Sequence, residues 1–467
     1  MRAFYFRGGR TAAAGARNES ESDRLARLET IKELTERVSA MSSGWRWLPG
    51  SVHKALATFS RTPLEFGPGG NAGLCVVVDL TPLLPGGENG GAKPMTLELI
   101  RRMASSSPKT KFILLTLSRT FDELTAFKQP NVQVVVVDEL RTKTFWSKPK
   151  PGIPKRGSLV RRLGGNVLFC PFTAPSFAQA GIPTVSVIYD LQYADYPQYF
   201  EGRARSQRRK NFTEACRRAD RLVCISDFVR RRVLEESGLP QERVITVRIQ
   251  LAHRLPSLAP EVSASVLARL QLTPGRYFLY PANFWKHKNH EMLLVAMGLF
   301  TTRFRHSDLK LVCTGAPGER RDFLQSATER MGLREKVVLP GYLSESDFSA
   351  LMQSCLALIF PSLYEGFGMP VIEAQSIGKP VLCSNLASLP EVVGEAALVF
   401  DPKLPESIVA AMRQIESDLT VRQDLIRNGF ENVKRFADAD AMASQYLTTL
   451  GEVVQGASSP RRELRHG

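Results

Sequence analysis

Short apolar runs rich in Val, Ile and Leu alternate with helix-like segments along most of the chain, and this alternation constrains the fold more than any other feature. Strands that are apolar on both sides must be covered on both faces, and strands separated by helices pair in parallel. A first series of runs lies at residues 74–80, 111–117, 132–137, 166–170, 184–189, 222–226 and 243–249. After a segment near residues 250–265, a second series follows at residues 277–281, 309–315, 336–340, 356–362, 380–384 and 397–400. The sequence therefore predicts an α/β protein with two doubly wound, Rossmann-like domains that face each other across a cleft.

The length of the chain, 467 residues, exceeds what a single core usually spans. We expect an N-terminal extension that is partly helical or disordered, two Rossmann-like domains, and a C-terminal helix with a basic tail, at residues 1–70, 71–255, 256–440 and 441–467. In the extension, Trp45 and Trp47 stand beside basic residues. They indicate either contact with a membrane interface or a helix packed on the body of the protein.

The charge balance is strongly basic, with a formal net charge of +16 and clusters of Arg and Lys at residues 201–212 and 459–467. These clusters lack interleaved aromatic residues and match no DNA-binding motif, so we expect no nucleic-acid partner. A basic face favours phosphorylated ligands or peripheral contact with an anionic membrane surface. Solvated helix faces are an equal alternative for any one cluster.

The cysteines and the length of the apolar runs indicate the cellular compartment in which the protein is expected. Most of the seven cysteines lie in apolar strand-like runs, and the sequence contains no Cys-x-x-Cys pair. Buried, reduced thiols are typical of a cytoplasmic protein. No apolar run approaches the roughly 20 residues of a membrane-spanning helix. We expect a cytoplasmic protein whose membrane contact, where it has any, is peripheral and at the cytoplasmic face.

The stretch "FPSLYEGFGMPVIEAQSIGKPVLCSN" combines two carboxylates with a glycine loop at the end of a predicted strand. Glu365 lies in the loop, and Glu373 lies about one turn into the helix that Pro370 begins. Gly366 and Gly368 allow the backbone to approach a ligand closely, and the N–H groups of the helix start favour phosphate. Carboxylates accept hydrogen bonds from hydroxyl groups. A sugar joined to a nucleotide offers both phosphates and hydroxyls.

In this context the sequence closely resembles the group 1, family 4 glycosyltransferases, which are retaining enzymes of the GT-B fold. Their two glutamates separated by seven residues match Glu365 and Glu373, and residues 378–402 are similar to that family nearly throughout. The resemblance implies that Glu365 contacts the donor sugar and that Glu373 binds the ribose of the nucleotide. It also places Phe367, between the two glycines, in the donor-binding loop.

The resemblance covers roughly residues 74–450 and is strongest at residues 277–402. It implies that the second domain holds the nucleotide sugar and that the first domain holds the acceptor. The identity of the acceptor is therefore encoded in the half of the chain in which the resemblance is weaker.

The stretch "YPANFWKHKNHEMLLVA" follows a predicted strand and opens a helix. It resembles the family's loop whose basic pair grips the diphosphate. Lys288 matches the lysine of that pair, and Asn283 stands where the family usually has an arginine. The same Asn variant is typical of bacterial members that resemble mannosyltransferases, which favours GDP-mannose slightly as the donor. Lys286 is the candidate for the second positive charge, with a solvated lysine as the alternative.

The stretch "LLPGGENGGAKP" joins the first predicted strand to the first helix and is not a P-loop, because no Gly-Lys-Ser/Thr occurs. In GT-B enzymes the equivalent glycine loop meets the donor phosphate and the acceptor. The resemblance therefore makes Gly86 and Gly87, with Gly90 and Gly91, candidates for donor contact. A flexible turn is the alternative.

Three further stretches follow predicted strands or begin helices. In "VIYDLQYADYPQYF", Tyr189 stands where the family has a histidine, and Asp190 is either a cleft residue or a strand-end cap. Ser226 is expected to be the N-cap of the next helix. The Asp-x-Asp at residues 438–440 is interpreted as a helix start rather than as a metal site. We expect neither a metal nor another cofactor.

Taken with the resemblance, these residues predict transfer of a hexosyl group, with mannosyl as a candidate, from a nucleotide diphosphate sugar to a glycan, lipid-linked or polysaccharide acceptor. Lys288, Glu365 and Asp190 are the expected catalytic residues, and cations with backbone N–H groups would stabilise the leaving diphosphate. Two alternatives stay open. One is a protein that binds nucleotide sugars without turnover. The other is a nicotinamide-dependent dehydrogenase, which the missing dinucleotide-binding fingerprint disfavours.

Overall fold

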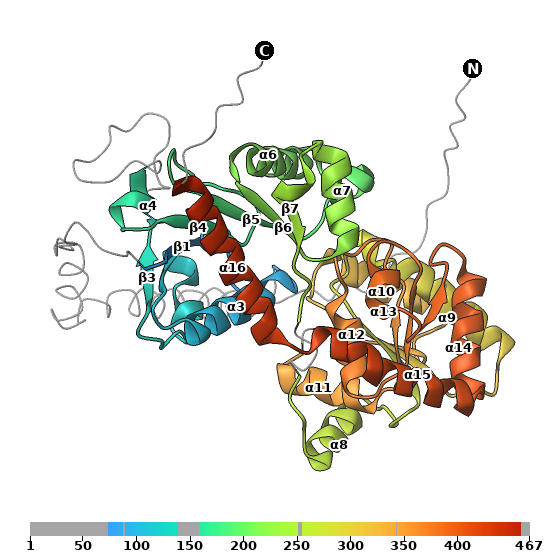
Figure 1. Cartoon of the computed structure of the whole chain (residues 1–467). Helices are drawn as coiled ribbons and strands as arrows, with labels where there is room; N and C mark the ends of the chain where they lie inside the picture. Colours follow the sequence, from blue (N-terminus) through green and yellow to red (C-terminus); the bar gives the residue numbers. More distant parts are fainter. Residues whose placement is uncertain (1–72, 87–88, 139–157, 251–254, 342, 459–467) are drawn as a thin grey trace, which may run out of the picture. The chain divides into compact units, whose positions relative to one another are not determined.

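The computed structural model describes residues 73–86, 89–138, 158–250, 255–341 and 343–458. Two parallel sheets with helices on both faces make up this part of the chain, which confirms the predicted fold class (Figure 1). The predictions about the N-terminal extension with Trp45 and Trp47, about Gly87, and about the basic tail at residues 459–467 lie outside the described residues.

The first sheet has seven strands in the order β3-β2-β1-β4-β5-β6-β7, and every neighbouring pair is parallel. The strands are β1 (Cys75–Asp79), β2 (Lys111–Thr116), β3 (Val132–Val136), β4 (Val167–Cys170), β5 (Thr184–Ile188), β6 (Arg221–Cys224) and β7 (Val244–Thr246). The α-helices of this part are α3 (Ala92–Ser106), α4 (Leu159–Arg162), α5 (Gln192–Asp195), α6 (Gly202–Arg218) and α7 (Asp227–Ser237). Its 3₁₀ turns are η2 (Ser118–Thr120), η3 (Asp122–Leu124), η6 (Pro197–Tyr199) and η7 (Gln241–Arg243).

The second sheet has six strands in the order β10-β9-β8-β11-β12-β13, again all parallel. The strands are β8 (Tyr277–Pro281), β9 (Lys310–Thr314), β10 (Val337–Gly341), β11 (Ala357–Phe360), β12 (Val381–Ser384) and β13 (Leu398–Phe400). The helices are α8 (Pro260–Arg269), α9 (His290–Arg303), α10 (Glu319–Arg330), α11 (Glu345–Ser354), α12 (Met369–Ser376), α13 (Leu389–Val393), α14 (Pro405–Ser417), α15 (Leu419–Val433) and α16 (Ala439–Ser458), with the 3₁₀ turns η8 (Lys286–Lys288) and η9 (Lys434–Phe436).

The apolar runs form strands because both of their faces are covered. In β1, Val76, Val77 and Val78 are fully buried, and the four residues of β11 are buried as well. A side chain pointing to either face of such a strand meets a helix rather than water. Each run named in the sequence overlaps a strand of the structure.

The strand order of each sheet reverses once, and this reversal locates the ligand site. In the first sheet the chain switches direction between β1 and β4, and in the second sheet between β8 and β11. In open parallel sheets, ligands bind in the crevice beyond the carboxyl ends of the strands at such a switch point. The loops that follow β1, β8 and β11 are the ones that the sequence singled out as functional.

The last helix returns to the first domain. Helix α16 packs on α3 and on β4, where the ring of Tyr446 lies 5.7 Å from the ring of Phe169, centroid to centroid, in an edge-on contact (Figure 1). Asp438 begins this helix by accepting the Ala441 N–H at 2.7 Å, which confirms that the Asp-x-Asp is a helix start. In the ranges that the structure describes, no helix is both long enough and apolar enough to cross a membrane.

Candidate active site

A cleft of about 1200 Å³ is lined by loops of both sheets. It gathers the predicted site residues that the structure describes. These are Gly86, Asp190, Asn283, Lys286, Lys288, Glu365, Gly366, Phe367, Gly368 and Glu373.

Lys288 and Glu365 form an ion pair in this cleft. Lys288 Nζ lies 2.7 Å from Glu365 Oε1, and each side chain is 12% exposed. Lys288 Nζ also lies 5.6 Å from the centroid of the Phe360 ring. The two residues meet because β8 and β11 are neighbouring parallel strands, so the loops at their carboxyl ends are adjacent. The pair is neutral as a whole, although a ligand with negative charge near Lys288 would compete with the carboxylate.

The backbone at Lys288 is held from two sides. The Tyr280 hydroxyl donates to the Lys288 carbonyl at 2.6 Å. The next residue, Asn289, has a left-handed conformation with φ of 62°, which asparagine tolerates better than most residues. Its side-chain amide donates to the carbonyls of Pro361 at 3.2 Å and Pro402 at 2.8 Å. The position of the lysine is therefore fixed before any ligand binds.

Two histidines flank this turn and are neutral at physiological pH. Burial, together with the positive charge of Lys288, lowers the pKa of His287 and of His290 to about 3. His290 packs between the rings of Tyr280 and Phe284 at centroid distances of 4.6 and 4.9 Å. Neither imidazole therefore adds positive charge to the cleft.

Residues 365–368, the Gly366 loop, require glycine at two positions. A Cβ on Gly366 would overlap the carbonyl oxygen of Tyr189, which belongs to the first domain. Gly368 has φ of 100°, and a Cβ there would lie 2.7 Å from Leu389 Cδ2. Gly366 thus allows its backbone to approach the Tyr189 backbone closely across the cleft, and Gly368 fits beside the Leu389 side chain of its own domain. Both glycines also line the cleft, and close approach of their backbone to a ligand stays a prediction.

Ser388 holds the Gly366 loop from the second domain. Its hydroxyl lies 2.9 Å from the Glu365 carbonyl and 3.2 Å from the Phe367 carbonyl, and it donates to these oxygens. Phe367 is 2% exposed, and its ring packs edge-on against Phe436 at 5.5 Å. The loop is thus a braced element, and the Phe367 side chain contributes mainly to packing.

Glu373 lies where the sequence predicted. Helix α12 begins at Met369 with Pro370 in its first turn, and Glu373 follows about one turn later. The side chain is 2% exposed and lines the cleft. A carboxylate accepts hydrogen bonds from hydroxyl groups, so a ligand with hydroxyl groups could bind at this position.

Asn283 braces a neighbouring loop. Its side-chain oxygen accepts the Ala316 N–H at 3.0 Å. A Cβ on Gly315 would lie 2.6 Å from the Ala282 carbonyl oxygen, so this loop packs tightly against the one that carries Asn283. Asn283 therefore shapes the cleft wall, and the second positive charge stays a prediction for Lys286.

The glycine loop after β1 closes the cleft from the first domain. The Gly86 N–H donates to Glu123 at 3.2 Å, and the Gly86 carbonyl accepts from Lys93 at 2.8 Å. Lys93 also forms an ion pair with Glu123. A Cβ on Gly90 would lie 3.6 Å from the Trp285 ring of the second domain. The described part of this loop is thus tied down rather than a free turn.

Tyr189 and Asp190 follow β5 at the cleft edge. The Tyr189 hydroxyl lies 2.9 Å from the Thr96 hydroxyl on α3, and burial raises the pKa of the phenol well above its usual value. The Tyr189 phenol therefore does not replace the imidazole of the histidine that the family has at this position. Asp190 accepts the Gln192 N–H at 3.1 Å, within the turn that follows β5. Both predictions for Asp190 therefore agree with the structure, because it lines the cleft and also caps the end of a strand.

Three residues that line the cleft have no motif in the sequence that marks them as functional. Trp285 is 47% exposed although it lines the cleft. Arg208 lies on α6, stacks on the Phe200 ring at 5.1 Å, and is near enough to His287 to lower its pKa. Arg320 forms an ion pair with Glu291. Arg208 belongs to the basic cluster at residues 201–212, which suggested a phosphorylated ligand. The spacing of the cluster does not show which of its arginines faces the cleft.

Comparison with known proteins gives two family matches. Residues 89–248 match the model described as Glycosyltransferase Family 4, and residues 269–432 match the model described as Glycosyl transferases group 1. The chain is 32% identical to the O-antigen chain mannosyltransferase B of Escherichia coli over 256 residues, or 54% of this chain and 66% of that protein. It is 27% identical to the serotype-specific mannosyltransferase WbdA of Escherichia coli over 53% of this chain and 31% of that protein. The matches thus span at most about two thirds of these relatives.

Solved structures share the fold. Anabaena HepE in complex with UDP and glucose has a TM-score of 0.64 at 15% identity, covering 81% of this chain and all of that chain. WaaG, a glycosyltransferase involved in lipopolysaccharide biosynthesis, has a TM-score of 0.60 at 14% identity, covering 80% of this chain and 99% of that chain. These likenesses confirm the GT-B architecture, and at such identity they speak to fold alone.

Proposed function

We propose that this chain, which belongs to the group 1, family 4 glycosyltransferases, moves a hexosyl group from a nucleotide diphosphate sugar to a glycan, lipid-linked or polysaccharide acceptor with retention of configuration. The observation that carries the proposal is the ion pair of Lys288 and Glu365 in a cleft between two Rossmann-like sheets, at their switch points. Glu373 and the Gly366 loop lie along the same cleft.

In the proposed reaction, the bond between the anomeric carbon and the diphosphate oxygen breaks, and a bond to the acceptor hydroxyl oxygen forms on the same face. The leaving diphosphate takes the acceptor proton, so that no protein nucleophile is needed. Lys288 would stabilise the charge that develops on the diphosphate, and Glu365 would contact the donor sugar. Asp190, at the cleft edge, is the proposed third contributor.

The negative charge of a diphosphate calls for more than one cation. Lys288 is already paired with Glu365, Lys93 with Glu123, and Arg320 with Glu291. Among the described residues that line the cleft, Lys286 and Arg208 are the cations without a carboxylate partner. We propose that these two supply the balancing charge, which makes a resident metal unnecessary.

The donor sugar that we propose first is mannose. Two relatives described above are named mannosyltransferases. The family resemblance also associates an asparagine at the position of Asn283 with mannosyltransferase-like members. GDP is the first candidate for the nucleotide, with UDP and ADP as alternatives. The acceptor is proposed to be a growing glycan, free or lipid-linked, held by the first domain.

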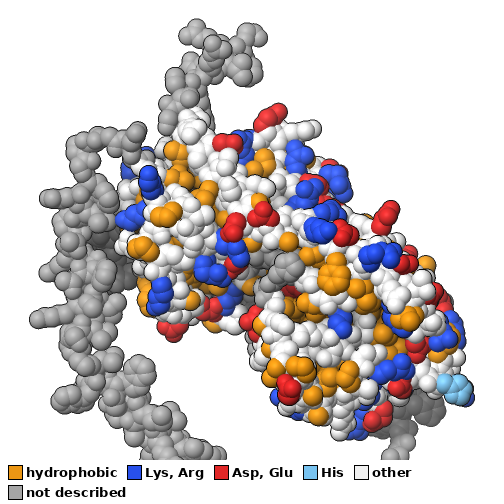
Figure 2. All heavy atoms as spheres, turned by 60° about the horizontal axis from the view of Figure 1, so that its bottom comes forward, with side chains coloured by type: hydrophobic (Ala, Val, Ile, Leu, Met, Phe, Trp, Pro, Cys, Tyr) orange, Lys and Arg blue, Asp and Glu red, His pale blue; other side chains and the backbone are white. Residues whose placement is uncertain are grey.

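Peripheral membrane contact is proposed only for the basic start of α6. Arg203, Arg205, Arg209 and Lys210 are exposed there. On the face that Figure 2 presents, Lys and Arg side chains are interspersed with Asp and Glu. Attraction of these side chains to an anionic surface would be screened by salt.

The test is to supply UDP-, GDP- and ADP-hexoses with a mannose-containing oligosaccharide or a lipid-linked sugar as acceptor. The proposal predicts acceptor-dependent release of one nucleoside diphosphate and a product whose anomeric configuration, read by NMR, matches that of the donor. Binding of the nucleotide sugar without release would favour a binding protein. Binding of NAD alone would favour a dehydrogenase.

A further inference from the structure

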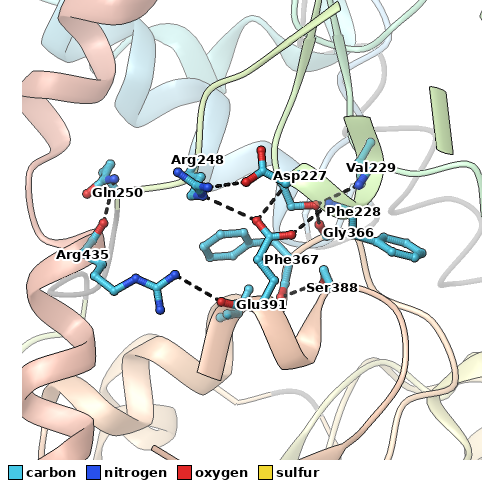
Figure 3. A network of polar contacts seen from close by, with 12 residues as sticks. Asp227, Phe228, Val229, Arg248, Gln250, Gly366, Phe367, Ser388, Glu391 and Arg435 are labelled. Atoms are coloured by element: carbon cyan, nitrogen blue, oxygen red, sulfur yellow. Dashed lines mark hydrogen bonds and ion pairs between the residues drawn. The ribbon is translucent and has the colours of Figure 1, made fainter. Parts of the chain in front are cut away.

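The N-terminus of helix α7, in the first domain, is capped by a side chain of the second domain (Figure 3). Glu391, on α13, accepts the Asp227 N–H at Oε1 and the Phe228 N–H at Oε2, both at 2.9 Å. The first N–H groups of a helix have no partner within it, and the helix dipole favours a carboxylate there. The α7 end is thus complete only when the two domains are together.

Ser226 connects the same helix end to the Gly366 loop. Its hydroxyl accepts the Val229 N–H at 3.2 Å, which confirms its predicted role as N-cap. The same hydroxyl donates to the Gly366 carbonyl at 2.7 Å, across the domain boundary. Ser226 is fully buried, so this bond is shielded from water. The sequence could not show the second bond, because its partner lies far away in the chain.

Charged groups surround this contact (Figure 3). Arg248 donates to Glu391 Oε1 at 3.4 Å and also pairs with Asp227. Arg435 donates to the Glu391 carbonyl at 3.3 Å. The Glu391 carboxylate therefore has an arginine partner as well as its two backbone donors, which holds its orientation.

The hydrogen-bond network extends to both segments in which the chain crosses from one domain to the other. Gln250, just after the first sheet, donates to the Arg435 carbonyl at 2.9 Å and accepts the Asp438 N–H at 3.2 Å. Residues 434–438 form the return passage toward α16. The contact of Glu391 with α7 is therefore linked to the two crossing segments, which would bend if the domains closed on each other.

We propose that Glu391 and Ser226 are positioning residues of the transfer reaction. Ser226 bonds the start of α7 directly to the Gly366 loop, which carries Glu365. Glu391 bonds the same helix start to α13, and Ser388, just before α13, holds that loop. The inference rests on the proposed function. Opening the cleft would separate Glu391 and Ser226 from their partners across the boundary and return those groups to water. The bonds thus favour the closed arrangement, in which Gly366 meets the Tyr189 carbonyl.

The test compares Glu391→Ala and Glu391→Gln with the wild-type full-length chain by hydrogen–deuterium exchange. The amides of residues 227 and 228 should exchange about tenfold faster in Glu391→Ala, with residues 230–237 unchanged. The kcat for transfer should fall by about tenfold to a hundredfold through misalignment of the loop, while the Kd for the nucleoside diphosphate changes less than about threefold. Glu391→Gln keeps one acceptor oxygen, so its exchange rates and its kcat should lie between those of the wild type and those of Glu391→Ala.

Ser226→Ala has a matched control in Ser344→Ala. Ser344 caps α11 by accepting the Asp347 N–H at 3.1 Å, and the structure shows no bond from it to the first domain among the residues described. Both variants lose a helix cap, but only Ser226→Ala should lose kcat. A kcat that falls equally in both, or does not fall in Glu391→Ala, would overturn the positioning role.

Exchange requires no substrate, so the two proposals can fail separately. A wild-type protein that transfers sugar, with unchanged kcat in Glu391→Ala, contradicts the positioning role alone. A wild-type protein that transfers no sugar, while exchange still differs between variants, contradicts the proposed function and the positioning role with it.

Discussion

At the scale of single residues, the site depends on charges that are partly withdrawn from water. Lys288 and Glu365 are each 12% exposed and 2.7 Å apart. The sequence predicted both residues and gave them separate roles. It did not predict that they pair, because pairing depends on β8 and β11 being neighbours in the sheet.

Breaking this pair from one side should destabilise the protein more than removing both charges. Lys288→Met leaves the Glu365 carboxylate partly buried without its partner and should lower the free energy of unfolding by about 3 kcal/mol. The double variant Lys288→Met/Glu365→Gln should recover part of that loss, since no isolated charge remains. Urea unfolding of the single and double variants measures the coupling. Additive losses would show that the pair is not coupled in the folded protein.

At the scale of elements, the sequence predicted the strands well because buried parallel strands are continuous apolar runs. Side-chain directions in the loops were predicted less well. Tyr189 turns toward α3, and Asn283 braces the Ala316 loop, through contacts with segments far away in the sequence. Local spacing carries no information about such partners. Tyr189 and Asn283, which differ from the family pattern, are therefore explained by their contacts with α3 and with the Ala316 loop.

The η8–α9 turn should make stability depend on pH. Burial lowers the pKa of His290 to about 3, against about 6.5 in an unfolded chain. The unfolded state therefore binds a proton that the folded state does not, and stability falls as pH drops from about 6.5 toward 3. Between pH 7.5 and pH 5 this one histidine should account for about 2 kcal/mol of lost stability.

Replacing His290 with phenylalanine keeps an aromatic ring between Tyr280 and Phe284 and removes the titrating group. Urea unfolding at pH 7.5 and pH 5 should show a smaller loss in His290→Phe than in the wild type, by about 2 kcal/mol. The exposed His306 provides the control, and His306→Ala should leave the difference unchanged. An identical pH dependence in His290→Phe and the wild type would contradict the assignment.

At the scale of the whole described chain, α16 ties the end of the second domain to the first. Tyr446 is fully buried against Phe169, and its hydroxyl has no hydrogen-bond partner among the described residues. A buried ring stabilises through packing, whereas an unpaired buried hydroxyl does not. The helix should therefore depend on the ring of Tyr446 and not on its oxygen.

Tyr446→Ala should lower the free energy of unfolding by about 3–5 kcal/mol, because it leaves a cavity beneath α16. Tyr446→Phe should be neutral or slightly stabilising, because it removes the unpaired hydroxyl. Phe430→Ala is the control, since this aromatic residue on α15 is 47% exposed and its loss should matter less. Chemical unfolding of the three variants measures these changes in the free energy of unfolding. Strong destabilisation by Tyr446→Phe would show that the hydroxyl has a structural partner.

Calorimetric titration of UDP, GDP, ADP and NAD into the full-length protein tests whether the cleft holds a nucleotide diphosphate sugar. One nucleoside diphosphate should bind, and Glu373→Gln should weaken this binding about tenfold or more through loss of charged hydrogen bonds to the ribose. Glu406 pairs with Arg303 on the surface of the same domain, so Glu406→Gln should bind like the wild type. Binding of NAD alone, or equal affinity of Glu373→Gln and the wild type, would show that the cleft does not hold a nucleotide sugar in this way.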